Sequence, residues 1–206
     1  MQTAAHTRRI MIEQARKRQR PGSSSTLAFL RERTCRIPWP DLGPTLGDIL
    51  WAVVGAAATR LYMPERATFD LDVAVLVTNA ADARARLAAA GAVYQGERSS
   101  GGSHWALADG TPVDVLELMD GWAGEALVAA ASNRDAQGLP VLPLPYLIRM
   151  KFEAGRLQDI ADVTRMLGLA GEAQLAEIRE VFGDLPDEDR ADLESLIQLG
   201  RLETGG

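Results

Sequence analysis

Alternating apolar and polar residues mark the strands that this sequence predicts. Within residues 69–77, four alternate positions are Asp70, Asp72, Ala74 and Leu76, and the intervening ones are Leu71, Val73, Val75 and Val77. This period of two is typical of a β-strand, whose successive side chains point to opposite faces. Residues 111–118 repeat the pattern, with Asp114 alternating with Val113 and Val115. An apolar run at residues 51–54 predicts a buried strand that ends at Gly55, and weaker strands are expected at 92–95 and 104–108.

Helical spacing dominates the rest of the chain. The first twenty residues predict a polar helix, which Pro21 and Gly22 end, and a second short helix is expected at 26–36. Further helices are predicted at 56–62, 80–90, 123–131, 146–153, 157–167, 173–182 and 189–202. These elements indicate an α+β fold, a small mixed β-sheet flanked by helices and followed by a C-terminal helical region. The predicted parts are a basic helical arm and linker (1–44), a core sheet (45–120) and a helical region packed on the core (121–206).

Composition excludes several classes of protein. The chain has 206 residues, of which 47% are hydrophobic and 24% charged, an ordinary globular balance. No apolar run reaches the roughly 18 residues of a membrane helix, and no secretory signal is recognised. Cys35 is the single cysteine, which excludes an internal disulfide and a cysteine-based zinc site. We therefore expect a soluble cytoplasmic protein that has no membrane partner.

The net charge of −6 divides unevenly along the chain. Residues 1–36 hold nine basic and two acidic side chains and carry +7, so the remaining residues carry −13. A basic arm on an acidic body either binds a polyanion or folds against that body. The first 28 residues contain no aromatic side chain on which a base could stack. The charge pattern alone leaves both interpretations open.

The carboxylates of Asp70 and Asp72 are the most informative feature. Two acids at i and i+2 of a strand project from one face, with their Cα atoms about 6.5–7 Å apart. A divalent cation between them relieves their repulsion, and oxygen ligands favour Mg²⁺ or Mn²⁺. Asp114, on a later strand, can join them if the two strands are neighbours. The alternative is an acidic strand face that is simply solvated, as such faces often are.

Residues between Gly55 and Asp70 supply candidate phosphate contacts. Gly55 ends a strand and opens a helix, where its backbone can approach a phosphate closely. Arg60, Arg66 and Thr68 follow and are candidate phosphate partners. The segment from Ser99 to His104 lacks the lysine of a phosphate-binding loop and is interpreted as a flexible hairpin tip. His6 and His104 are too few and too far apart in sequence for a histidine metal site.

These motifs together resemble a known family. The stretch from Trp51 to Arg60, followed by Arg66-Ala-Thr-Phe-Asp-Leu-Asp-Val73, resembles the opening of nucleotidyltransferases of the DNA polymerase β-like superfamily. Pro112-Val-Asp-Val-Leu116 matches the strand of the third family carboxylate. Leu144-Pro145, Lys151 and Arg156-Leu-Gln-Asp159 are similar to the AbiEii-like group of toxin–antitoxin nucleotidyltransferases. The resemblance covers about residues 48 to 168.

The resemblance implies a role for each matching residue. It implies that Asp70, Asp72 and Asp114 are catalytic and bind Mg²⁺ or Mn²⁺, with Asp114 helping to activate the acceptor. Backbone at Gly55 and Ala56 is expected to hold the β- and γ-phosphates of an NTP such as ATP. The other expected nucleotide-binding residues are Arg60, Arg66, Thr68, Lys151, Arg156 and Asp159, with Asp159 orienting Lys151 or Arg156.

The implied activity is transfer of a nucleoside monophosphate from an NTP to a hydroxyl of RNA, including tRNA, of a protein or of a small molecule. A toxin–antitoxin role would add a cognate protein partner. Ala56 departs from the family, which often has serine at this position. Without the hydroxyl group, weaker binding of the nucleotide phosphates is expected. The alternative function is therefore a catalytically idle binding module, an antitoxin or a nucleic-acid adaptor. A third possibility is a structural protein whose acidic strand face is only solvated.

Overall fold

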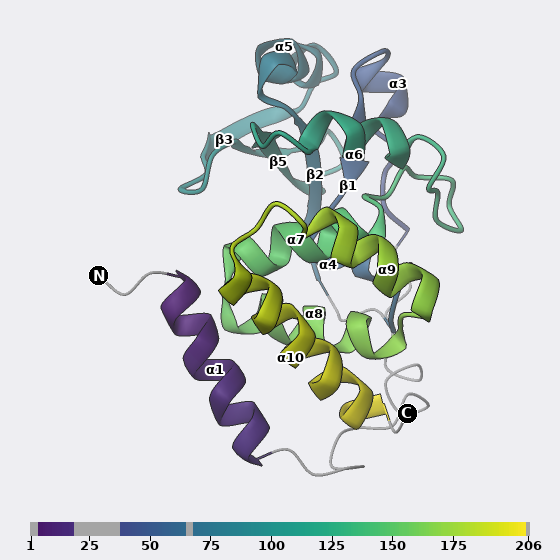
Figure 1. Ribbon diagram of the computed structural model, residues 1–206. Helices are drawn as coiled ribbons and strands as arrows, with labels where there is room; N and C mark the ends of the chain where they lie inside the picture. Colours follow the sequence, from purple (N-terminus) through teal and green to yellow (C-terminus); the bar gives the residue numbers. More distant parts are fainter. Residues whose placement is uncertain (1–3, 19–37, 65–67, 205–206) are drawn as a thin grey trace. The chain divides into compact units, whose positions relative to one another are not determined.

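The computed structural model describes residues 4–18, 38–64 and 68–204 (Figure 1). It confirms the α+β class, with a five-stranded mixed sheet and helices. Contacts divide the described chain into two compact units. The sheet unit consists of residues 38–61 and 68–143, and the helical unit consists of residues 4–18, 62–64 and 144–204.

The sheet unit is built around two parallel central strands. Its strand order is β1-β2-β5-β4-β3, with β2 and β5 parallel and the other neighbouring pairs antiparallel. The strands are β1 (Trp51–Val53), β2 (Leu71–Leu76), β3 (Val93–Glu97), β4 (Ser103–Ala106) and β5 (Pro112–Leu118). The helices are α3 (Gly43–Leu46), α4 (Gly55–Thr59), a 3₁₀ turn (Val77–Asn79), α5 (Ala80–Ala89) and α6 (Ala123–Ala130).

Strand β2 is the core of this unit. Val73, Ala74 and Val75 are fully buried, and successive strand residues point to opposite faces, so both faces of β2 are covered. The hydrophobic surface removed from water on two faces fixes the register of the strand, because a slip by one residue would exchange the faces. This register decides where the acidic residues of β2 and β5 lie.

The helical unit joins the N-terminal helix to the C-terminal ones. It contains α1 (Ala4–Arg18), α7 (Leu144–Ala154), α8 (Leu157–Leu169), α9 (Glu172–Val181) and α10 (Asp187–Thr204). Phe152 and Phe182 meet edge to face at the centre, with ring centroids 5.1 Å apart. Helices α8 and α10 cross at Gly168 and Gly200, where a Cβ on Gly200 would lie 2.2 Å from the Thr164 carbonyl oxygen. Small residues permit this close approach.

Most predicted elements are present, with shifted ends. One correction concerns the strand predicted at 69–77, since β2 begins at Leu71 and Asp70 lies in a bend before it. The pairing of β2 with β5 begins at Leu71 and Val113, and the preceding residue of β5, Pro112, has no N–H to extend the ladder toward Asp70. The helix predicted at 26–36 lies outside the described residues. The contact division also differs from the predicted domains, since α6 belongs to the sheet unit and α1 to the helical unit.

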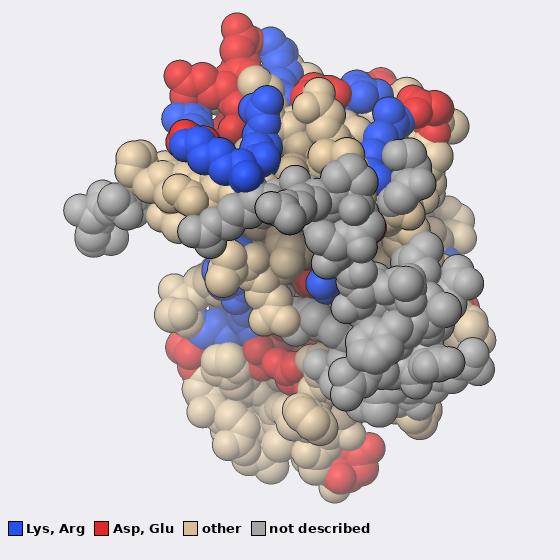
Figure 2. Space-filling view, turned by 90° about the horizontal axis from the view of Figure 1, so that it is seen from below, with Lys and Arg blue, Asp and Glu red and all other residues tan. Residues whose placement is uncertain are grey.

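Two basic residues of α1, Arg8 and Arg9, lie next to acidic residues of α10. Arg8 contacts Asp189 and Asp192 of α10, which runs beside α1 (Figure 1), and Arg9 contacts Glu188. In the face shown in Figure 2, Lys and Arg side chains likewise lie beside Asp and Glu side chains, most densely along its upper edge. For Arg8 and Arg9 these contacts match the second interpretation, in which the basic segment folds against acidic residues, while residues 19–37 lie outside the described residues.

Within the parts of the chain that the structure describes, no helix has both the length and the apolar character needed to cross a membrane.

Candidate functional site

Asp72 and Asp114 lie opposite each other on the two parallel central strands. The β2–β5 register pairs Asp72 with Asp114, and Asp70 reaches the same place from the bend before β2. One carboxylate oxygen from each of the three lies within 4.8 Å of the other two. All three residues are partly exposed. The structure therefore brings together the three aspartates that the sequence singled out, in an arrangement compatible with a metal ion.

Gly55 lies directly against Asp72. Its φ of +62° is a left-handed conformation that favours glycine. A Cβ at this position would lie 1.9 Å from Oδ2 of Asp72, so no other residue fits without movement of that carboxylate. The Val54 amide donates to the Asp72 carbonyl oxygen at 2.9 Å, which ties the end of β1 to β2. The turn from β1 to α4 is thus fixed beside the aspartates, as the motif at 51–60 predicted.

Thr68 holds the first aspartate. Its hydroxyl donates to Oδ1 of Asp70, and its side chain is buried. Thr68 therefore orients Asp70, a more indirect position than the phosphate contact expected from the sequence. Ala56, the residue after Gly55, is buried in α4.

Two residues that the sequence analysis did not select also enter the cluster. Arg98 contacts Oδ2 of Asp114 through Nη1, which also lies 3.6 Å from Oδ1 of Asp72. His104 Nδ1 lies 2.6 Å from Oδ1 of Asp114. His104 lies in β4, within the strand expected at 104–108, but the sequence analysis did not predict its pairing with Asp114. Local sequence did not give this register, because a two-residue turn at 109–110 would pair residue 104 with residue 115, whereas β4 and β5 pair it with residue 114.

The predicted phosphate-binding arginines are placed differently. Arg60 donates through Nε to Oδ2 of Asp135 at 2.9 Å, and Asp135 also accepts the amides of Gln137 and Leu139. This contact ties α4 to the loop after α6. Arg66 lies outside the described residues.

The predicted residues of α7 and α8 form a buried charge cluster in the helical unit. Lys151 Nζ donates to Asp159 at 3.1 Å and to Asp162 at 2.9 Å, and all three side chains are buried. Arg156 donates through Nε to the second oxygen of Asp159 at 2.6 Å. Asp159 thus contacts both basic residues between which the sequence left a choice. Two carboxylates and two cations balance the local charge, as buried ions require.

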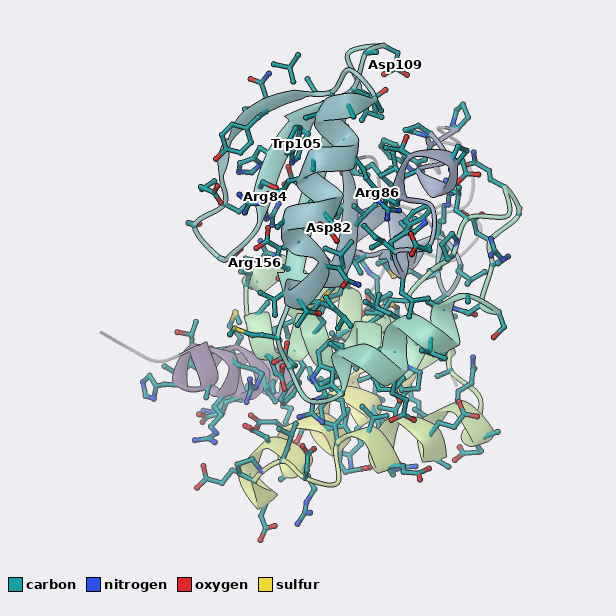
Figure 3. All side chains as sticks on the ribbon, turned by 90° about the horizontal axis from the view of Figure 1, so that it is seen from above. Asp82, Arg84, Arg86, Trp105, Asp109 and Arg156 are labelled. Carbon is teal, nitrogen blue, oxygen red and sulfur yellow. The ribbon has the colours of Figure 1, made fainter. Side chains whose placement is uncertain are left out.

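A second ion-pair cluster lies on the other face of the sheet. Arg84 of α5 donates to Glu117 of β5 at 2.8 Å and to both carboxylate oxygens of Glu97 of β3. The hydrogen bonds from Arg84 and Tyr94 lower the pKa of Glu97, and those to Glu97 and Glu117 raise the pKa of Arg84. Figure 3 shows Arg84 on the side of α5 toward Trp105, and Arg86 on the other side. Residues 114 and 117 point to opposite faces of β5, so Arg84 is separated from the aspartates by the sheet.

Comparison with known proteins gives a distant structural likeness. A crystal structure of ANT(2'')-Ia in complex with adenylyl-2''-tobramycin matches with a TM-score of 0.42 and 15% identity, over 73% of this chain and 88% of that one. A solution structure of ANT(2'')-Ia, an antibiotic-resistance factor, matches with a TM-score of 0.39 and 17% identity, over 75% of this chain and 83% of that one. No family model and no curated protein matches the sequence. At these scores the likeness assigns neither family nor activity to this chain.

Proposed function

We propose that this protein is a metal-dependent nucleotidyltransferase that moves a nucleoside monophosphate from an NTP to an acceptor hydroxyl. The observation that carries this proposal is the convergence of Asp70, Asp72 and Asp114 within 4.8 Å beside the Gly55 turn. Motif and geometry agree here, because the residues selected by the superfamily resemblance are the ones that the strand register brings together. The proposal rests on the sheet unit alone.

The donor set suits Mg²⁺ or Mn²⁺. Both ions bind carboxylate oxygens, and a Mg²⁺–oxygen distance of about 2.0–2.1 Å allows ligand atoms up to about 4 Å apart across the ion. One oxygen from each of the three aspartates lies within 4.8 Å of the other two, so the carboxylates would have to move closer together around a single ion. Gly55 leaves Asp72 the room that a Cβ would take. Bound ions of this kind stabilise negative charge on the reacting phosphate and on departing pyrophosphate.

The residues around the cluster then have distinct tasks. Asp70 and Asp72 are the proposed metal ligands, and Thr68 holds Asp70 in place. Asp114 completes the ligand set and accepts the proton of the attacking hydroxyl, in an orientation fixed by His104. The backbone at Gly55 and Ala56 is the proposed contact for the triphosphate.

The remaining predicted nucleotide-binding residues have structural contacts of their own. Arg60 pairs with Asp135, and Lys151 pairs with Asp159 and Asp162. A direct phosphate contact by Arg60, Arg66, Lys151 or Arg156, with Asp159 orienting a cation, remains the part of the proposal that comes from the resemblance. The core proposal does not depend on these residues.

A transfer assay tests the proposal. The protein is incubated with Mn²⁺ or Mg²⁺, each of the four α-labelled NTPs, and RNA including tRNA, protein or small hydroxyl compounds as acceptors. We expect label on one acceptor class, and its loss in Asp72→Asn. Asp82→Asn is the matched control, since Asp82 is an exposed carboxylate on α5 of the same unit. Transfer that survives Asp72→Asn overturns the assignment.

A second candidate function is a binding module with this site but without turnover, acting as an antitoxin or nucleic-acid adaptor. Ala56 favours it, because a hydroxyl partner for phosphate is missing there. The contacts of Arg8 and Arg9 with acidic residues of α10 leave less of the arm for a polyanion. Mn²⁺-dependent NTP binding without transfer to any acceptor would select this function. A toxin–antitoxin role would in addition require a cognate protein that copurifies with the chain.

A further inference from the structure

The guanidinium of Arg98 lies beside the carboxylates of Asp72 and Asp114, whose negative charges require a neighbouring cation. Its Nη1 contacts Oδ2 of Asp114 and lies 3.6 Å from Oδ1 of Asp72. Its side chain is 13% exposed, and its Nε is buried with no hydrogen-bond partner. A buried donor without an acceptor is costly, so this placement is held by the charge of the carboxylates and not by a complete set of hydrogen bonds.

The backbone brings Arg98 to the cluster. Arg98 begins the hairpin between β3 and β4, where its amide donates to the Gly102 carbonyl at 2.9 Å. Gly102 has a φ of +101°, and a Cβ there would lie 1.9 Å from the Val115 carbonyl oxygen. The absence of a side chain at Gly102 thus allows the base of the hairpin to pack closely against β5, next to Asp114. The residues at the tip, Ser99 to Gly101, are exposed.

Both oxygens of Asp114 are already engaged. Oδ2 accepts from Arg98, and Oδ1 lies 2.6 Å from His104 Nδ1. A divalent ion bound to Asp114 and Asp72 would place a second positive charge beside the positively charged guanidinium. Two cations at one pair of carboxylates repel each other. The ion and Arg98 therefore compete for the same two aspartates.

We propose that Arg98 is a displaceable counter-ion of the aspartate cluster. In the metal-free protein it neutralises part of the charge of Asp72 and Asp114. A divalent ion displaces the guanidinium of Arg98, which then binds a phosphate of the incoming nucleotide. A planar guanidinium can donate two hydrogen bonds to phosphate oxygens, so arginine is suited to this contact. Arg98 thereby couples the filling of the metal site to nucleotide binding. This inference deepens the proposed function and rests on it for the identity of the nucleotide.

Binding of Mn²⁺ alone tests the first half. Free Mn²⁺ is titrated by its electron paramagnetic resonance signal against the wild-type protein, Arg98→Met, Arg98→Lys and Arg84→Met. We expect Arg98→Met to bind Mn²⁺ about tenfold more tightly, because the substitution removes the charged donor that competes with the ion for the carboxylates. Arg98→Lys keeps a positive charge and should remain near the wild type. Arg84→Met is the matched control, because Arg84 pairs with acids of β3 and β5 on the other face; it should leave Mn²⁺ affinity unchanged.

Nucleotide binding at saturating Mn²⁺ tests the second half. ATP affinity, followed by isothermal calorimetry, should fall about tenfold in Arg98→Met, so that one substitution moves the two affinities in opposite directions. A purely structural role would lower both affinities. Unchanged or weaker Mn²⁺ binding in Arg98→Met overturns the counter-ion role, and unchanged ATP affinity overturns the phosphate contact. If Arg98→Met does not fold, Arg98→Gln replaces it in both titrations.

The outcomes separate this inference from the proposed function. Tighter Mn²⁺ binding in Arg98→Met, together with no transfer of label by the wild-type protein to any acceptor, would support the counter-ion role of Arg98 and contradict the proposed transferase activity. Transfer by the wild type, together with equal Mn²⁺ affinities of the wild type and Arg98→Met, would contradict the counter-ion role and support the transferase activity.

Discussion

Gly55 and Asp72 are in such close contact that a single added carbon on Gly55 would lie 1.9 Å from the Asp72 carboxylate. The two residues come from different elements, the turn after β1 and the start of β2. Their contact joins the expected phosphate-binding turn to the expected metal ligand. A substitution of Gly55 should therefore move the carboxylate of Asp72.

We predict that Gly55→Ala impairs the metal site. The new methyl group must displace the Asp72 carboxylate, and the φ of +62° adds strain of about 1 kcal/mol. Mn²⁺ affinity should fall about tenfold. Gly91→Ala is the matched control, since Gly91 has a φ of +87° and nothing within 4 Å of an added Cβ; it should lose stability without losing Mn²⁺ affinity. Equal Mn²⁺ affinities of Gly55→Ala and the wild type would contradict this prediction.

The buried cluster of the helical unit should be important for stability. Lys151→Met leaves Asp159 and Asp162 buried without the ammonium that both contact, and we expect a loss of about 3–5 kcal/mol in the free energy of unfolding. Arg156→Ala should cost less than about 1 kcal/mol, because the Arg156 side chain is 74% exposed. Urea denaturation measures both values.

A rescue variant keeps this prediction testable if Lys151→Met does not fold. Combining Lys151→Met with Asp159→Asn and Asp162→Asn removes the unpaired charges and should restore part of the stability. A stability of Lys151→Met close to that of the wild type would show that the buried pair is not needed.

Arg8 should fix α1 to the helical unit. It is buried, donates to the Phe152 carbonyl oxygen at 3.1 Å, lies 3.7 Å from the centroid of the Phe152 ring and contacts Asp189 and Asp192. Burial raises the pKa of Asp192, against the lowering effect of Arg8. We expect Arg8→Met to cost about 2–4 kcal/mol.

Arg9→Met is the control for Arg8, since Arg9 is 42% exposed and pairs on the surface. It should change stability by less than about 1 kcal/mol. Urea denaturation and limited proteolysis of α1 measure the difference. Equal effects of the two substitutions would mean that the buried contacts of Arg8 do not anchor the helix.

The pair of Arg149 and Asp184 should contribute to stability only above acid pH. The hydrogen bond from Arg149 lowers the pKa of Asp184. An acid whose pKa is lowered in the folded state stabilises it above the ordinary pKa of about 4, and that contribution is lost as the pH falls through the lowered value. Asp184→Asn should therefore be less stable than the wild type at neutral pH, and the difference should shrink toward about pH 2.

Urea midpoints across this pH range measure the effect. Glu177→Gln, at an exposed position of α9, is the control and should follow the wild type at every pH. A difference between Asp184→Asn and the wild type that stays constant with pH would show that the ion pair is not its cause.

The chain's own sequence determined the class of fold, the positions of most strands and helices, and the three aspartates. Local periodicity suffices for these, because alternation and helical spacing are properties of neighbouring residues. Tertiary pairing decided the rest. The pairing of β2 with β5 begins only at Leu71 and leaves Asp70 in the bend before the strand, and the register of β4 places His104 beside Asp114.

Arg98 and Arg60 show the same division. Nothing near Arg98 in sequence marks it as a partner of Asp114, because the contact depends on Gly102 pressing the hairpin against β5. Arg60 was a candidate for phosphate by its place after Gly55, yet Asp135, far along the chain, pairs with it. A charged side chain is paired with whichever opposite charge the fold brings near, and that choice is made by contacts between distant segments rather than by sequence spacing.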